Sequence, residues 1–173
     1  MDKLDKYAAT AIVLLIAISS VLIFYQISSG EAGNSAVMAQ RQPTAPDPQL
    51  KKKIHIASGL IANNNLDKAN TLIEELVSQF PYDGSPYMML GDLRIRQQVP
   101  IDAMLAYKEA VDLHPDYLDK KTPDFQGKKI KNTVKEARNL IEVALKKNSA
   151  DKEFRAYKKT VYYMLRKIAG SCG

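Results

Sequence analysis

The side chains best suited to chemistry in this 173-residue chain are few and stand far apart. His55 and His114 are its two histidines, and Cys172 is its one cysteine. A hydrolytic triad, a zinc site or a haem-attachment motif needs such groups at short, defined spacings, which do not occur here. Asp92 and the Glu74–Glu75 pair are acids of a kind that helix surfaces carry routinely. The sequence therefore predicts a non-enzymatic protein with no catalytic residues, no metal site and no cofactor.

Positive charge gathers toward the C-terminus. The formal net charge is +6, and residues 116–173 alone hold fifteen Lys/Arg against seven Asp/Glu. This asymmetry suggests an anionic membrane surface or an acidic partner, and a solvated lysine-rich helix face is the alternative. Nucleic acid is not expected, because no recognition motif accompanies the lysines. The candidate basic surface consists of Lys146, Lys147, Lys158 and Lys159.

An uncharged apolar run, YAATAIVLLIAISSVLIFY at 7–25, follows a short N-terminal flank, residues 1–6. A helix over these 19 residues would measure about 28 Å, close to the roughly 30 Å of bilayer hydrocarbon. The run is longer than the apolar core of a signal peptide, which has about 7–15 residues. We therefore expect a retained transmembrane helix.

The residues around this run predict its orientation and a linker after it. Lys3 and Lys6 precede the run and only Arg41 follows it closely, so the positive-inside rule favours a cytoplasmic N-terminus with the bulk of the chain outside. Residues 26–49 are rich in Ser, Gly, Ala, Gln and Pro. Such a composition buries too little apolar area to offset the entropy of ordering, which predicts a flexible linker. The folded part is expected to begin near Leu50.

Beyond the linker, the sequence repeats with a period of 34 residues. The tetrapeptide FPYD at 80–83 recurs as HPDY at 114–117. Helical repeats of this length are typical of stacked helix pairs. The same offset aligns three pairs of predicted core positions, which are Ala69 with Ala103, Ile73 with Tyr107, and Leu76 with Ala110.

The stretch GSPYMMLGDLRIRQQVPIDAMLAYKEAVDLHP at 84–115 resembles a tetratricopeptide repeat (TPR). Its first half has Tyr, Leu and Gly where that family has Trp, Leu and Gly, although Arg94 replaces the usual Tyr. Its second half has the family's Ala, aromatic, Ala and Pro. The resemblance implies an all-α, TPR-type solenoid of helix pairs over 50–149, preceded by the transmembrane helix. The repeat-packing residues it implies are Ala69, Pro81, Tyr87, Leu90, Gly91, Ala103, Tyr107, Ala110 and Pro115.

Capping signals predict where the helices of the middle repeat begin. Ser85-Pro86 is expected to open its first helix, and Pro100 its second, because Ser is a preferred N-cap and Pro suits the first helical turn. Pro115 is expected to lie beyond the end of that second helix.

The sequence of residues 118–149 predicts a degenerate third unit, with a helix that begins at Thr122-Pro123. An apolar stripe through this region also allows a single long helix; its members are Ile130, Val134, Ala137, Ile141 and Ala144. Ser149 is expected to cap a last helix, about 151–168, within a C-terminal capping segment, 150–173. Solenoids need a terminal element of this kind with a polar outer side.

TPR stacks bind extended peptides or partner helices in a concave groove formed by the first helix of each pair, and the resemblance implies such a groove here. The family's carboxylate clamp, which binds chaperone tails, needs Lys and Asn at set positions. This chain has Ile54, Ser58 and Asp92 at comparable positions, so the clamp is not expected. A core position is the alternative for Ile54 and Ile61. By repeat register the groove residues are Lys51, Ile54, Ser58, Ile61, Met88, Asp92 and Ile95.

An anchor followed by an extracytoplasmic TPR domain is similar in layout to bacterial cytochrome c biogenesis and haem-lyase accessory proteins. It is also similar to the layout of accessory subunits of respiratory and photosynthetic complexes, and of secretion and pilus assembly proteins. We therefore expect a scaffold or adaptor in the bacterial inner membrane, with its domain in the periplasm. Its partners would be membrane-complex subunits or an extended peptide. Two alternatives stay open: docking of the basic C-terminal helices on an anionic membrane or acidic partner, and a receptor facing the cytosol.

Overall fold

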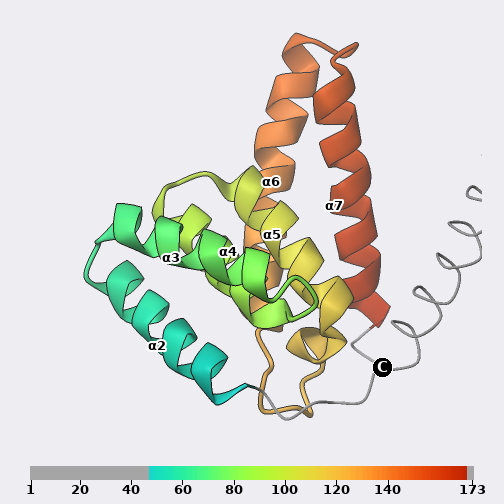
Figure 1. Cartoon of the computed structure of the whole chain (residues 1–173). Helices are drawn as coiled ribbons and strands as arrows, with labels where there is room; N and C mark the ends of the chain where they lie inside the picture. Colours follow the sequence, from blue (N-terminus) through green and yellow to red (C-terminus); the bar gives the residue numbers. More distant parts are fainter. Residues whose placement is uncertain (1–46, 171–173) are drawn as a thin grey trace, which may run out of the picture. The chain divides into compact units, whose positions relative to one another are not determined.

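A computed structural model describes residues 47–170, and all the secondary structure in this range is helical (Figure 1). This confirms the predicted all-α class. None of the helices in 47–170 is long and apolar enough to cross a membrane. The predicted flank 1–6, the predicted span 7–25, most of the linker and Cys172 lie outside the described residues. The elements are α2 (Pro48–Ala62), α3 (Leu66–Gln79), α4 (Gly84–Arg96), α5 (Pro100–Leu113), the 3-10 helix η1 (Pro115–Leu118), α6 (Gly127–Lys147) and α7 (Lys152–Gly170).

The helices pack as consecutive pairs. α2 contacts α3, α4 contacts α5, and α6 contacts α7. The second helix of each pair also packs on the first helix of the next, and α2 packs directly on α4. In Figure 1 the last pair, α6 and α7, stands as a tall hairpin beside the shorter helices. Residues 46–173 form one compact unit.

The backbone repeats at the same interval as the sequence over the first two pairs. α3 and α5 both have 14 residues, and they begin 34 positions apart, at Leu66 and Pro100. Asn64 and Gln98, also 34 apart, occupy the left-handed region with φ of 58° and 61° in the turns that precede these helices. The six aligned alanine, isoleucine, leucine and tyrosine positions of α3 and α5 are all fully buried. One local conformation is thus used twice.

Gly91 sets the distance between α4 and α5. A Cβ atom at this position would lie 2.8 Å from Cζ of Tyr107 and closer still to two other atoms of the same ring. Only glycine leaves room for that ring, so the tyrosine is drawn into the contact between the two helices.

Two buried clusters hold the stack together. The smaller cluster joins α2, α3 and α4 through residues such as Ile73 and Leu93. The larger one joins α4 and α5 to η1, α6 and α7, through residues such as Met104 and Met164. Because both clusters lie within 46–173, this part of the chain carries its own core and can fold without the residues before it.

Two predicted helix starts are wrong by about two residues, and a third helix has a different cap from the one predicted. α2 begins at Pro48, inside the predicted linker 26–49, because Asp47 caps it by accepting a bond of 2.8 Å from the amide of Gln49. Asp83, rather than Ser85, caps α4, with its Oδ1 2.7 Å from the amide of Ser85. Asp151, rather than Ser149, caps α7. In each case an aspartate provides the cap, where the sequence had indicated either a serine two residues away or no cap.

The start of the third unit is also wrong. The Oγ1 of Thr122 donates to the carbonyls of Asp116 and Asp119, which closes a turn instead of opening a helix. The amide of Gln126 then donates to the carbonyl of Tyr117, 2.8 Å away, and α6 begins at Gly127. From Gly127 onward the predicted apolar stripe is confirmed. α6 is one helix of 21 residues with Ile130, Val134, Ala137 and Ile141 buried and Ala144 half-buried.

Candidate functional site

A hollow of about 340 Å³ opens on the side of the stack where the first helices of the pairs, α2, α4 and α6, come together. Each of these helices contributes to its wall, and α5 contributes a side chain from behind. This is the side on which repeat register placed a groove. The lining residues are Ser58, Ile61, Ala62, Met89, Asp92, Ile95, Arg96, Tyr107 and Lys129.

Four of the seven predicted groove residues line this hollow: Ser58, Ile61, Asp92 and Ile95. Met88 does not. It is only 4% exposed and packs in the larger cluster, whereas its neighbour Met89 faces the hollow. Successive residues of an α-helix are rotated by about 100° around its axis. The prediction therefore placed the wrong one of two neighbouring methionines in the groove.

Two further groove residues lie on α2 but outside the hollow. Lys51 is exposed and Ile54 is half-buried, and neither is part of the lining. Ile61 both lines the hollow and belongs to the smaller cluster, so the core position considered for it also applies.

Three polar side chains from three helices meet in the hollow. The hydroxyl of Tyr107 donates to Oδ1 of Asp92 at 2.6 Å. Nζ of Lys129 lies 2.6 Å from the same oxygen and 5.5 Å from the centre of the tyrosine ring. Burial, reinforced by the charge and hydrogen bond of Asp92, raises the pKa of Tyr107 well above its ordinary value of 10.0. The tyrosine therefore stays protonated and acts as a donor at neutral pH.

This polar cluster, Asp92–Tyr107–Lys129, depends on the packing described above. Tyr107 can enter only because Gly91 leaves space for it, and Asp92 follows Gly91 directly. The connection at 119–126 ends beside α4, so that Lys129, in the first turn of α6, lies next to Asp92. The ion pair leaves one carboxylate oxygen, Oδ2 of Asp92, without a bond to any residue that the structure describes.

The lining offers apolar contacts beside a polar cluster. Aliphatic walls from Ile61, Met89 and Ile95 surround a cluster whose positive and negative charges cancel locally. Asp92 lines the hollow, so its second carboxylate oxygen can accept a hydrogen bond from a ligand there. Within 47–170 no group of three His, Cys, Asp or Glu side chains is placed to hold a metal ion.

The repeat-packing residues fall into three environments. Five are buried between helices, two are half-buried on α4, and the two prolines are exposed, one in the turn after α3 and one at the start of η1. In that order they are Ala69, Gly91, Ala103, Tyr107 and Ala110; Tyr87 and Leu90; Pro81 and Pro115.

The predicted basic residues all lie on the last two helices. Lys146 and Lys147 are exposed in the last turn of α6, where cations are favoured by the helix dipole. Lys159 is exposed on α7, and Lys158 is half-exposed beside a small notch between the helices. The hollow and these lysines are therefore separate features.

The lining residues that the sequence missed are Ala62, Met89, Arg96, Tyr107 and Lys129. Tyr107 was predicted as a packing residue, and its ring does pack, but its hydroxyl also reaches the hollow. Its pairing with Asp92, 15 residues away, follows from the contact of α4 with α5, which the repeat pattern could have indicated. Lys129 carries no local signal of this role.

Comparison of this chain with models of known protein families, with curated proteins and with solved structures finds no match.

Proposed function

We propose that this chain is a membrane-anchored helical-repeat adaptor of TPR type, and not an enzyme, that binds a segment of a partner protein in the hollow between α2, α4 and α6. The observation that carries the proposal is that hollow itself, which is formed by the first helix of successive pairs. The 34-residue period of both sequence and backbone supports the TPR assignment.

The lining indicates what kind of segment would fit. An aliphatic side chain can pack among Ile61, Met89 and Ile95, where it buries apolar surface worth about 25 cal/mol per Å². A backbone amide beside that side chain can donate to the free Oδ2 of Asp92. An extended peptide presents both groups together, so a segment with an isolated aliphatic residue is the expected ligand.

The cellular setting of this proposal comes from the sequence. The apolar run at 7–25 would hold the adaptor in a bacterial inner membrane, and Lys3 and Lys6 favour a periplasmic position for residues 47–170. There it would act as an assembly factor that gathers subunits of a membrane complex.

Ser58→Arg tests the hollow without touching the core. Ser58 is exposed at the rim, so a long charged side chain should fill the hollow and leave unfolding unchanged. Ser78→Arg is the matched control, because Ser78 is exposed on α3 and is not part of the lining. The full chain is used as bait in detergent-solubilised membranes. The protein recovered with the wild type should be lost with Ser58→Arg and kept with Ser78→Arg. Equal recovery with both variants would exclude the hollow as the binding site.

A further inference from the structure

The outer side of the α6–α7 hairpin carries two parallel rows of basic residues, which together we name the basic face. Both rows follow the spacing of three and four residues that aligns side chains along one side of a helix. All members are exposed except Glu142, which is half-exposed. The α6 row is Lys128, Lys131, Lys135, Arg138, Glu142 and Lys146. The α7 row is Lys152, Arg155, Lys159, Tyr162 and Arg166.

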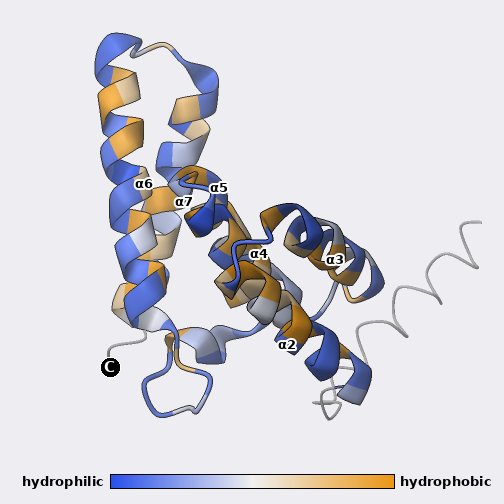
Figure 2. Cartoon of the chain, turned by 90° about the vertical axis from the view of Figure 1, so that its left-hand side faces the viewer, coloured by the Kyte–Doolittle hydropathy of each residue, from blue (hydrophilic) through white to orange (hydrophobic). Residues whose placement is uncertain are grey.

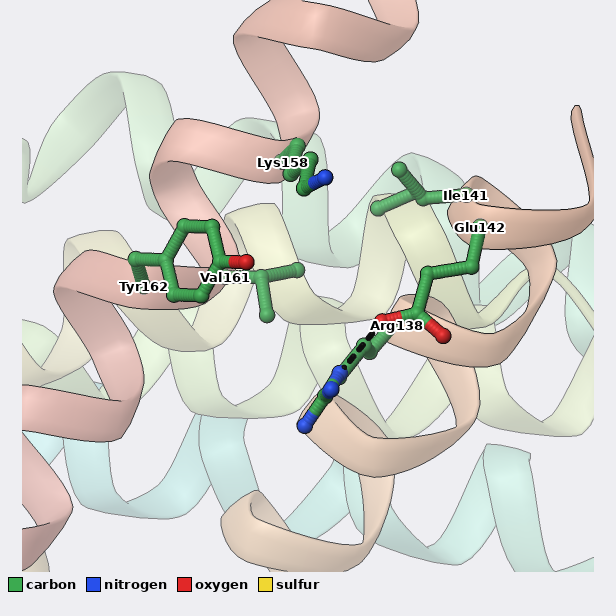
Figure 3. A pocket seen from close by; sticks show the side chains of 6 residues that line it. All are labelled: Arg138, Ile141, Glu142, Lys158, Val161 and Tyr162. Carbon is green, nitrogen blue, oxygen red and sulfur yellow. Dashed lines mark hydrogen bonds and ion pairs between the residues drawn. The ribbon is translucent and has the colours of Figure 1, made fainter. Parts of the chain in front are cut away.

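The two rows adjoin. Arg138 and Glu142 of α6 and Lys158 and Tyr162 of α7 line one notch between the helices (Figure 3). Nε of Arg138 lies 2.7 Å from Oε1 of Glu142, which neutralises the one acid of the face. The rows therefore form a single surface, with Tyr162 near its middle and half of that side chain exposed.

Within 47–170, the cations of this face other than Arg138 have no ion pair, whereas lysines on the inner side do. Among the described residues, Lys129 pairs with Asp92, and Lys108 and Lys167 pair with Asp112. The acids of α4 and α5 thus match the lysines that face them. On the basic face only Arg138 has an ion pair within 47–170. Over 127–170 the chain has thirteen Lys/Arg against four Asp/Glu. This excess charge therefore belongs to the outer side.

The basic face is long, and the notch between its two helices is small. α6 and α7 have 21 and 19 residues, or about 30 Å each, and lie side by side in Figure 1. The notch between them holds only about 10 Å³. In Figure 2 polar and apolar residues alternate along both helices, as expected of helices with one buried and one exposed side. A long cationic surface of this kind suits an extended anionic one. Single-stranded nucleic acid would instead need a groove and several aromatic platforms, and this face has one tyrosine.

We propose that the basic face binds the anionic headgroups of the membrane that holds the predicted anchor at 7–25. Tyr162 would lie at the level of the headgroups, where aromatic residues with a polar tip are favoured. The predicted linker would allow this contact, because a flexible chain of that length spans about 25 Å. The proposal shares the anchor with the proposed function but assigns a ligand to a surface that takes no part in the hollow.

A vesicle-binding assay on residues 46–173 removes the anchor and tests the face alone. Vesicles contain either phosphatidylcholine only or phosphatidylcholine with phosphatidylglycerol. We expect binding to the anionic vesicles only, weakened by salt. Each basic side chain near the surface contributes about fivefold, so Lys159→Gln with Arg166→Gln should weaken binding by about 30-fold. The matched control, Lys52→Gln with Lys68→Gln, removes the same charge from exposed positions on α2 and α3 and should change binding little.

Tryptophan fluorescence locates the contact, since the chain has no tryptophan of its own. Tyr162→Trp places a single reporter at the middle of the face, and its emission should shift to the blue when anionic vesicles are added. Tyr82→Trp is the control, because Tyr82 is 80% exposed in the turn between α3 and α4. Its emission should stay unchanged. The same contrast should appear with the full chain in anionic and neutral bilayers.

Three outcomes would overturn this proposal. One is the absence of binding to anionic vesicles. Another is equal weakening by the two pairs of substitutions, which would show that net charge acts without a defined face. The third is tighter binding of poly(U) RNA than of vesicles, lost with Lys159→Gln and Arg166→Gln, which would make the face a nucleic-acid site. None of these results would bear on the hollow, because Ser58→Arg leaves this face intact.

Discussion

Gly91→Ala is the substitution whose effect the packing of this fold predicts most sharply. The added Cβ would lie 2.8 Å from Cζ of Tyr107 and closer to Cδ1 and Cε1, whereas carbon atoms pack at about 3.5–4.0 Å. The ring must therefore move by about 1 Å, although it is fully buried and its hydroxyl is bonded to Asp92. Overpacking of this kind costs about 1–3 kcal/mol. Alanine recovers about 0.5–1 kcal/mol of helix propensity. Because three ring atoms would be too close, the overpacking should cost about 2–3 kcal/mol, the upper part of that range, which leaves a net loss of about 1–2.5 kcal/mol.

Urea unfolding of residues 46–173, followed by far-UV circular dichroism, measures this loss. Gly59→Ala is the matched control, because Gly59 is exposed in α2 and a Cβ there meets nothing within 4 Å. That variant should be as stable as the wild type or more stable by up to about 1 kcal/mol. Both substitutions add the same methyl group to a helix, so the difference between them isolates the contact with Tyr107.

A double-mutant cycle with Tyr107→Leu checks the cause. Leucine removes the ring atoms that an alanine at position 91 would meet, so Gly91→Ala should be less destabilising in the Tyr107→Leu background. An unchanged midpoint for Gly91→Ala, or equal losses in both backgrounds, would show that α4 and α5 do not meet through this pair.

Further predictions concern pH and topology. The pKa of Tyr107 in the folded state is raised above 10.0, so the free energy of unfolding should fall as the pH rises beyond 10. Tyr107→Phe should reduce this alkaline loss of stability. The same substitution should cost about 1.5–3 kcal/mol at neutral pH, because it removes the hydrogen bond to Asp92. Burial raises the pKa of Asp112, but hydrogen bonds from Tyr163, Lys108 and Lys167 outweigh it and leave the pKa below 3.8. Stability should therefore be lost as the pH falls below about 3.8, and Asp112→Asn should flatten this part of the urea–pH profile. A reporter that is active only in the periplasm, fused after the C-terminus, should be active; activity of a cytoplasmic reporter instead would reverse the orientation.

The sequence predicted best what is repeated along the chain. Pro100 and the 34-residue period predicted the position of α5, and the same period predicted the position of α3. Both helices follow the same kind of turn, which contains one residue in the left-handed region. The bounds of α4, α6 and α7 were less accurate. Their caps are aspartates or turns that lie near the expected Ser and Thr, and a preference for several polar residues does not choose among them.

The candidate site was predicted only as far as the repeat register reaches. Ser58, Ile61, Asp92 and Ile95 follow from that register, whereas Met88 differs from Met89 by one position and sequence periodicity could not separate them. Lys129 could not be foreseen. It reaches Asp92 only because the connection at 119–126 ends where it does, which is a property of the folded chain.

Site-specific photo-crosslinking from within the hollow tests the central claim most directly. Ala62 is exposed and lines the hollow, so a photoreactive phenylalanine analogue there would touch a bound segment without disturbing the core. The same group at Ser78 on α3 is the control. With the full chain in its membrane, irradiation should give a crosslinked partner protein from position 62 and none from position 78. Equal crosslinking from both positions, or none from position 62 while the partner is still recovered with the protein, would contradict binding in the hollow.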